Sequence, residues 1–253
     1  MHHSCRYVRR GLFVIRRRPF NTRRGFFTIR RGRCQPEHIG VLLSETSLID
    51  CADCPRMVAL RETVRRDYPS YHAAPVAAWS VRGARLLMVG LAPGMHGANA
   101  TGRPFTGDAS GVFLFAALHR AGFSSSPMAT DAVLQNASIT NAVKCLPPAN
   151  KPLAAEITQC RKYLIAEIES FAPAGGSRLR RPRCILCLGR LAHDAVIKAM
   201  ALAPMAFGHG EVHRLAERLY LMDTYHPSRQ NTNTGRLTAA MLDSVFQRIR
   251  TLL

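Results

Sequence analysis

The stretch Arg85-Leu-Leu-Met-Val-Gly90-Leu-Ala-Pro-Gly94 gives the clearest indication of the fold class of this chain. An apolar run that ends in a Gly/Pro loop is typical of a buried β-strand. Residues 110–121 follow with helical spacing of apolar side chains, and Gly122 is a helix stop signal. This strand, loop and helix predict one unit of an α/β domain.

The same alternation continues to the C-terminus. It predicts strands at 137–143, 183–188 and 218–224 and helices after Pro152, at 191–202 and at 236–252. Alternating elements of these lengths indicate a three-layer α/β/α domain with a mainly parallel central sheet. On the helix after Pro152, steps of three and four residues place Leu153, Ile157, Cys160, Leu164, Ile168 and Phe171 on one inward stripe. We expect this domain to span residues 37–253.

The charge is strongly positive. The 253 residues carry 35 Lys and Arg against 16 Asp and Glu, a formal charge of +19, which excludes a binder of cationic partners and favours polyanions. Residues 1–33 contain 11 Arg and no acid. We expect residues 1–36 to form a disordered basic extension; a transit peptide and a DNA-gripping arm are the alternatives. No apolar run approaches the roughly 18 residues that span a bilayer.

Ligands of parallel sheets bind outside the carboxyl ends of the strands. Three loops in this chain leave such ends, at 92–108, 141–151 and 225–235. All three are rich in the Gly, Asn, Thr, His and Pro residues expected where a backbone approaches a ligand. We therefore expect the functional site to lie among these loops.

The cysteines divide into two kinds. Cys51 and Cys54 form a C-x2-C pair, and Cys145 and Cys160 lie downstream, so four thiolates can converge on a zinc ion or an iron-sulfur cluster; buried free thiols are the alternative. Cys184 and Cys187 lie within one apolar strand and point to opposite faces, so we interpret them as core residues. Disulfides are not expected, because no secretory leader of normal composition is present.

Three longer stretches carry a family resemblance. They are Gly90-Leu-Ala-Pro-Gly-Met-His-Gly-Ala-Asn-Ala-Thr-Gly-Arg-Pro-Phe-Thr-Gly-Asp-Ala-Ser-Gly111, Thr140-Asn-Ala-Val-Lys-Cys145 and His226-Pro-Ser-Arg-Gln-Asn-Thr-Asn-Thr-Gly-Arg-Leu-Thr238. Together they resemble the family 5 uracil-DNA glycosylases, the iron-sulfur branch of the superfamily, over about residues 48–253.

The resemblance implies a monomeric DNA repair enzyme of the bacterial cytoplasm. It would hydrolyse the N-glycosidic bond of uracil in DNA and leave an abasic site, with hypoxanthine and other deaminated bases as further candidate substrates. The family places a [4Fe-4S] cluster on cysteines that match Cys51, Cys54, Cys145 and Cys160. Two alternatives are a catalytically silent iron-sulfur protein that binds damaged DNA and a zinc-stabilised nucleic-acid module.

The resemblance also assigns roles around a flipped-out base. Phe105 would stack on uracil, Asn141 would read its O4 and N3-H, and His226 would donate to O2 as charge develops on the leaving base. The first loop would complete the pocket with Ala92, Gly94 and His96, although a purely positioning role explains His96 equally well.

One position departs from the other branches of the superfamily. They place a carboxylate where this chain has Ala92, which cannot activate water. Asn99 matches a position linked to water activation, but an amide only positions water and does not accept its proton. We therefore expect a dissociative reaction with water held by Asn99. Asp108 is the alternative, although turn capping suits it better.

The loop after His226 is expected to contact DNA. Hydroxyl, amide and guanidinium groups suit phosphate contact and insertion into a groove. The expected DNA-binding residues are Ser228, Arg229, Gln230, Asn231 and Arg236.

Overall fold

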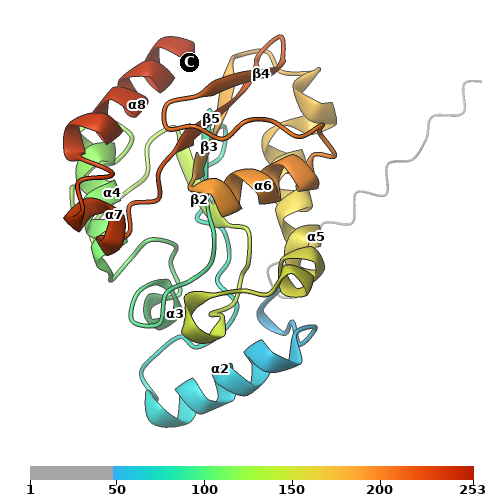
Figure 1. Cartoon of the computed structure of the whole chain (residues 1–253), viewed down its shortest axis with the longest axis vertical. Helices are drawn as coiled ribbons and strands as arrows, with labels where there is room; N and C mark the ends of the chain where they lie inside the picture. The colour runs from blue at the N-terminus through green and yellow to red at the C-terminus, as the bar shows by residue number, and fades with distance from the viewer. Residues whose placement is uncertain (1–47) are drawn as a thin grey trace, which may run out of the picture. The chain divides into compact units, whose positions relative to one another are not determined.

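The structure is a computed structural model that describes residues 48–253. Its centre is a five-stranded sheet in the order β2-β1-β3-β5-β4 (Figure 1). Four strands run parallel, and β4 pairs antiparallel with β5 at one edge. The strands are β1 (Leu86–Gly90), β2 (Ala137–Asn141), β3 (Arg183–Leu188), β4 (Val212–Ala216) and β5 (Leu219–Thr224).

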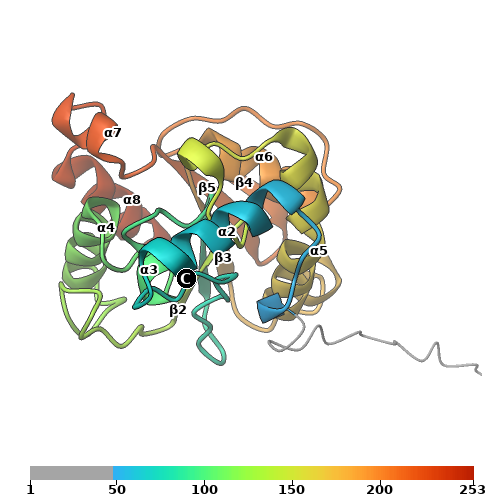
Figure 2. The ribbon, with the colours of Figure 1, turned by 90° about the horizontal axis from the view of Figure 1, so that it is seen from below.

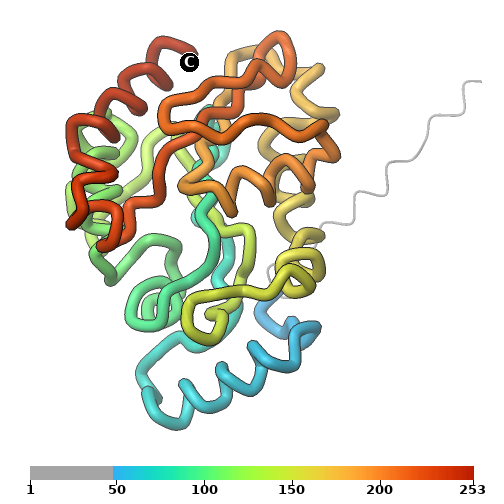
Figure 3. Tube along the Cα trace, in the orientation of Figure 1, coloured from blue at the N-terminus to red at the C-terminus, as the bar shows by residue number. Residues whose placement is uncertain are grey.

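Helices cover both faces of the sheet. Helices α4 and α8 lie on one side and α5 and α6 on the other, as Figures 2 and 3 show. The described helices are α2 (Pro55–Asp67), α3 (Ala98–Thr101), α4 (Ala109–Arg120), α5 (Ala154–Phe171), α6 (Arg190–Ala199), α7 (Arg229–Asn233) and α8 (Ala239–Leu252), with 3₁₀ turns η1 (Pro148–Asn150) and η2 (Pro173–Gly176). The expected three-layer α/β/α class is confirmed.

The core divides according to the alternation of side chains along the strands. Leu86 and Met88 pack toward α4 and α8, whereas Leu87 and Val89 pack toward α5 and α6. All five residues of β1 are buried. A strand covered on both faces therefore reads as a continuous apolar run, which is why the sequence reveals it so clearly.

The register of the parallel strands brings the polar loops together at one end of the strands. Gly90 at the end of β1 pairs with Asn141 at the end of β2. Leu188 at the end of β3 pairs with Thr224 at the end of β5. The loops at 92–108, 141–151 and 225–235 therefore all leave the carboxyl ends of the strands, as the sequence predicts.

The structure also corrects several expectations. The last helix begins at Ala239, because the Thr238 hydroxyl accepts a hydrogen bond from the Met241 amide and caps it there. Leu153 is exposed because it precedes the first turn of α5, although Cys160 is buried as expected. Helix α2 and the edge strand β4 are not anticipated from the sequence.

The described residues bear on two further expectations. Cys184 and Cys187 are fully buried on opposite faces of β3, which confirms them as core residues. The expected basic extension at 1–36 lies outside the described residues. Within residues 48–253, no helix combines the length and apolar character needed to cross a bilayer.

Candidate active site and cysteine cavity

The side chains of Phe105, Asn141 and His226 lie near one another at the end of β1, and the region where they meet is termed the slot. A methyl group on Gly90 would overlap Oδ1 of Asn141 and would come within 2.7 Å of the Phe105 ring. Both side chains therefore approach the Gly90 backbone so closely that only glycine fits between them. The centroids of the Phe105 and His226 rings are 6.1 Å apart. The structure thus brings Phe105, Asn141 and His226 together around one position.

The loop that carries Phe105 is tightly constrained. Phe105 has a φ of +53°, a left-handed conformation that is uncommon for a residue with a side chain. A Cβ on Gly111 would collide with the Phe105 carbonyl, so the start of α4 packs directly against this loop. Backbone strain of this kind persists where the surrounding structure enforces it, as is common at binding sites.

Two buried amide groups, one at the end of β2 and one in α3, lack partners among the described residues. Oδ1 of Asn141 and Nδ2 of Asn99 are shielded from solvent and accept or donate no hydrogen bond. Leaving such an atom unpaired costs about 1–3 kcal/mol. An acceptor on Asn141 and a donor on Asn99 are therefore available for groups that enter the site.

His226 is held in the neutral state. Burial lowers its pKa from the ordinary value of 6.5, and the negative charge of Asp108 opposes this shift. A Cβ on Gly189 at the start of α6 would come within 3.1 Å of His226 Cβ, so the absence of a side chain there admits the histidine. A neutral imidazole can still donate one N–H.

Asp108 caps a helix. Its Oδ1 accepts a hydrogen bond from the Gly111 amide at 2.8 Å at the start of α4. Its Oδ2 lies against Gly97 and Gly94. The turn-capping interpretation of Asp108 thus matches its geometry.

The other first-loop residues lie in different surroundings. The Gly94 carbonyl accepts the amide of Asn99 at 3.1 Å and so sets the turn that buries Asn99. Ala92 packs with Val143 and Cys160 in the apolar cluster of the cysteine region. Its place in that cluster gives Ala92 a packing role beside the expected one in the pocket.

His96 points into an exposed aromatic group. Its Nδ1 is 2.8 Å from the Tyr71 hydroxyl, and Tyr71 stacks on Tyr68 with centroids 4.7 Å apart. These tyrosines follow α2 and are not anticipated from the sequence, because nothing in their spacing links them to the loop of His96. The contact fits the positioning role of His96.

The loop after His226 uses part of its polar groups internally. Ser228 caps α7 by accepting from the Asn231 amide, and Nδ2 of Asn231 donates to the His226 carbonyl at 2.8 Å. Arg229 and Gln230 are exposed. The guanidinium of Arg236 lies 4.7 Å from the centre of the Tyr225 ring. Ser228 and Asn231 therefore hold His226 in place, while Arg229 and Gln230 face solvent.

The four cysteines expected to bind a cluster line one cavity. Cys51, Cys54, Cys145 and Cys160 surround it together with apolar side chains such as Met57. Cys54 is the residue before the first turn of α2, where amide groups and the helix dipole favour negative charge. Segments about 90 residues apart in the chain thus meet around these thiols.

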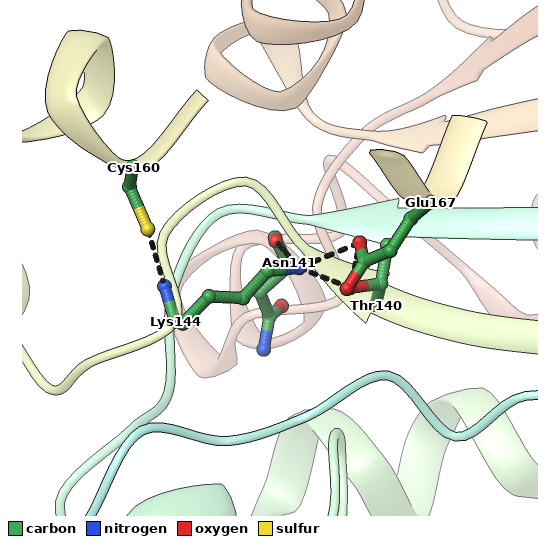
Figure 4. Close-up of polar contacts among 5 residues, drawn as sticks. All are labelled: Thr140, Asn141, Lys144, Cys160 and Glu167. Carbon is green, nitrogen blue, oxygen red and sulfur yellow. Dashed lines mark hydrogen bonds and ion pairs between the residues drawn. The ribbon is translucent and has the colours of Figure 1, made fainter. Parts of the chain in front are cut away.

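The electrostatics of this cavity suit a cationic group. Burial, with smaller contributions from the neighbouring thiols, raises the pKa of Cys145 to about 12, and burial raises the pKa of Cys160 to about 11. The Lys144 amide donates to Sγ of Cys160 at 3.3 Å, as Figure 4 shows. A cysteine binds a metal as the deprotonated thiolate, so a bound metal group would offset the repulsion among these thiolates.

The sulfurs of these four cysteines are less closely spaced than the ligands of a zinc ion. A zinc ion holds its sulfurs at about 2.3 Å, so they lie roughly 4 Å apart. Among the described residues, no three of these four cysteines place their sulfurs within 4.8 Å of one another. As they lie, these side chains therefore do not form a closed single-ion site.

A second set of donor atoms lies deeper in the core. Cys187, His193 and Asp223 place their ligand atoms within 4.8 Å of one another and can by geometry hold a metal ion. However, Nδ1 of His193 and Oδ1 of Asp223 already share a hydrogen bond at 2.9 Å. Nε2 of His193 is 3.2 Å from the Met205 carbonyl oxygen. These bonds alone account for the buried His193.

A buried lysine joins the slot to the cysteine cavity. Nζ of Lys144 donates to the Thr140 hydroxyl at 2.6 Å, to the Asn141 carbonyl at 2.8 Å and to the Glu167 carboxylate at 2.6 Å (Figure 4). Lys144 is completely buried. Its position within Thr140–Cys145 is evident in the sequence, but its partner on α5 is not.

Comparison with known proteins identifies the family of this chain. The family model of the uracil DNA glycosylase superfamily matches residues 78–250. The type-5 uracil-DNA glycosylase of Pyrobaculum aerophilum is 45% identical over 79% of this chain and 88% of its own length. The type-5 enzymes of Thermus thermophilus and Mycobacterium tuberculosis are each 41% identical, over 81% and 80% of this chain and 95% and 78% of their own lengths.

The fold and the slot at the strand ends thus define a member of the uracil-DNA glycosylase superfamily. Within that superfamily, the chain belongs to the type-5 uracil-DNA glycosylases.

Proposed function

We propose that this protein excises uracil from DNA by hydrolysing its N-glycosidic bond and leaving an abasic site. One observation carries the proposal: Phe105, Asn141 and His226 surround a single slot beside Gly90, and Oδ1 of Asn141 has no partner there. Neither the comparisons nor the geometry favours a catalytically silent protein. Other deaminated bases such as hypoxanthine remain further candidate substrates of the same slot.

Recognition would use a flat face and a polar edge. The Phe105 ring stacks on the flipped-out base. Oδ1 of Asn141 accepts the N3-H of uracil, and Nδ2 of the same amide donates to O4. Cytosine carries an amino group in place of O4 and no hydrogen on N3. Its amino donor would face the Nδ2 donor, and its N3 acceptor would face the Oδ1 acceptor, so neither hydrogen bond forms.

Bond cleavage would be dissociative. The C1′–N1 bond breaks, its electron pair moves onto the base, and positive charge develops on the sugar. The N–H of neutral His226 donates to uracil O2, where the negative charge appears. Because this hydrogen bond strengthens as the bond breaks, it lowers the barrier rather than merely binding the substrate.

Water completes the reaction at C1′. The unpartnered Nδ2 of Asn99 donates to the water oxygen and positions it. The oxygen bonds to C1′, the water proton passes to solvent, and the departing uracil anion takes up a proton. The amide of Asn99 orients the nucleophile but does not accept its proton.

A [4Fe-4S] cluster is proposed on the thiolates of Cys51, Cys54, Cys145 and Cys160. Four thiols around one cavity, of which no three place their sulfurs within 4.8 Å of one another, support this assignment. When bound, the cluster would cross-link the segment before α2 to the segment between β2 and α5. Its contribution would be to stability and to the placement of the Asn141 loop.

Exposed Arg229 and Gln230 are proposed to contact the DNA backbone, with Arg236 beside them and with Ser228 and Asn231 supporting the loop from within. We further propose that residues 37–253 form the catalytic domain, that the enzyme acts as a monomer, and that it works in the cytoplasm, where a bacterial genome lies.

Excision can be measured by incubating the full chain with uracil-containing single- and double-stranded oligonucleotides and cleaving abasic sites with alkali. Strand breaks at uracil are expected, and breaks at background level would contradict the proposal.

The water-positioning step is tested with Asn99→Ala, which should lower the single-turnover rate by about 10- to 100-fold without weakening uracil binding. Asn99→Asp, which can accept a proton, should restore or exceed the wild-type rate. Wild-type turnover by Asn99→Ala would remove Asn99 from the mechanism.

A further inference from the structure

A basic segment lies outside the site described above. The run Arg178-Leu-Arg-Arg-Pro-Arg183 joins η2 to β3, and no acidic residue occurs between Glu169 and Asp194. We propose that this segment forms a second nucleic-acid site, which takes the phosphate backbone of a DNA segment other than the one in the active site.

The segment builds a hollow. Five arginines, Arg85, Arg178, Arg180, Arg181 and Arg183, line an open space of about 530 Å³ together with Asn136, and no acidic side chain takes part in its lining. Like charges gathered in this way repel one another, and a bound anion relieves that repulsion. Arginine also matches phosphate geometry with two parallel hydrogen bonds, which lysine does not.

Part of this cluster is fixed and part is unused. The Arg85 guanidinium donates to the Leu253 carbonyl, and the Arg183 guanidinium donates to the Phe171 carbonyl. Within residues 48–253, the guanidinium groups of Arg178, Arg180 and Arg181 form no hydrogen bond or ion pair. Three exposed cations are thus available for a ligand, beside two that the fold already holds in place.

The segment that carries them is itself anchored. The Arg218 guanidinium donates to the Arg180 carbonyl at 2.7 Å and ties the segment to the start of β5. The backbone that presents Arg178, Arg180 and Arg181 is therefore held at a defined place, although their side chains are exposed. A fixed backbone with unpaired cations reduces the ordering cost of binding a phosphate.

The hollow and the candidate active site lie at opposite ends of the strands. Arg85, Asn136 and Arg183 stand at the amino ends of β1, β2 and β3, whereas the slot lies at their carboxyl ends (Figure 1). Strands of five or six residues separate these ends by roughly 17–20 Å, and the loops increase this distance. A duplex held at the slot does not extend around the sheet, so the occupant of the hollow is a second segment.

Membership in a DNA glycosylase family favours nucleic acid over other polyanions as the occupant. Binding in the hollow does not depend on which base the active site excises. One protein molecule should therefore hold two duplexes at once.

The test is an energy-transfer assay with two uracil-free duplexes, one carrying a donor dye and the other an acceptor. The full chain should bring them together. Arg178→Ala/Arg180→Ala/Arg181→Ala should reduce second-duplex affinity by about tenfold or more at moderate salt and lower the salt slope by about 0.9 for each phosphate that the variant no longer neutralises. Cleavage of a short uracil oligonucleotide should stay unchanged, which shows that the variant is folded.

A matched control removes charge elsewhere. Arg66→Ala/Arg161→Ala lies on α2 and the first half of α5 and should keep the energy transfer. All variants retain residues 1–33 with their 11 arginines, so those residues do not account for a difference between variants. Light scattering should find one chain with two duplexes.

Four results would overturn the proposal. They are no energy transfer with the wild type, an equal loss in the control and triple variants, unchanged transfer in the triple variant, and a bridging complex that contains two protein chains. Inorganic phosphate serves as a separate probe: if the hollow binds it and the triple variant still bridges two duplexes, the site takes a small anion only.

Discussion

Nζ of Lys144 and Oε2 of Glu167 form an ion pair of 2.6 Å between the end of β2 and α5, with 1% and 20% of the two side chains exposed. The same ammonium group bonds the Asn141 carbonyl, and the Lys144 amide bonds Sγ of Cys160. One residue therefore contacts both Asn141, which is proposed to read the base, and Cys160, a proposed cluster ligand. A disturbance at either site has a direct route to the other.

Glu167→Gln is expected to destabilise the protein by about 3 kcal/mol, because it leaves the buried Lys144 ammonium without a counter-charge. For a domain of this size, that corresponds to a fall of roughly 6–12 °C in the midpoint of thermal unfolding. Asp243→Asn is the control, since it weakens an ion pair with Arg120 that is partly exposed and worth about 0.5 kcal/mol. Equal shifts in the two variants would contradict a special role for the buried pair.

Asn141→Ala is expected to lower kcat/KM for uracil excision by about 100-fold or more, because the uracil edge loses its hydrogen-bond partner. The thermal midpoint should change little, since Oδ1 of Asn141 bonds to no other described group. Single-turnover rates and thermal unfolding of the same preparation separate the two effects. A large loss of stability with a proportionate loss of activity would instead indicate a structural role.

The pH dependence should follow His226. Because burial lowers its pKa, the folded enzyme keeps a neutral His226 at pH values below 6.5, where the unfolded chain is already protonated. The acid limb of the excision rate should therefore lie below pH 6.5, and stability should fall as the pH falls from 6.5 toward the lowered pKa. His226→Gln should lose this contribution in a comparison of thermal midpoints across pH. An acid limb above pH 6.5 would show that another group controls the rate.

Cys160→Ser is expected to remove most of the bound iron and acid-labile sulfide and to lower the thermal midpoint, because a cross-link between distant segments is removed. Cys184→Ala serves as the control, since that thiol is equally buried but lies in the core of β3. Iron and sulfide analysis of anaerobically purified protein gives the readout. Full iron content in Cys160→Ser, or zinc in place of iron in the wild type, would refute the proposed cluster.

The strongest signals in the sequence are local. Strands β1 and β3 are buried on both faces, so each appears as an unbroken apolar run, and β3 is predicted at its observed bounds. Strand β4 is not predicted, because an edge strand with Val212-His-Arg-Leu-Ala216 lacks such a run and owes its conformation to pairing with β5. Helix α2 likewise shows a weak apolar stripe.

Residue patterns along the chain were enough to predict the α/β class and the three loops that leave the carboxyl ends of the strands. The family resemblance pointed to Phe105, Asn141 and His226. Patterns of this kind are local and can be read directly from the order of residues. The folded arrangement was needed to show that Glu167 meets Lys144, that five arginines share one hollow, and that four cysteines from distant segments line one cavity. Such relationships join residues far apart in the chain, and their distances arise from packing that no local pattern records.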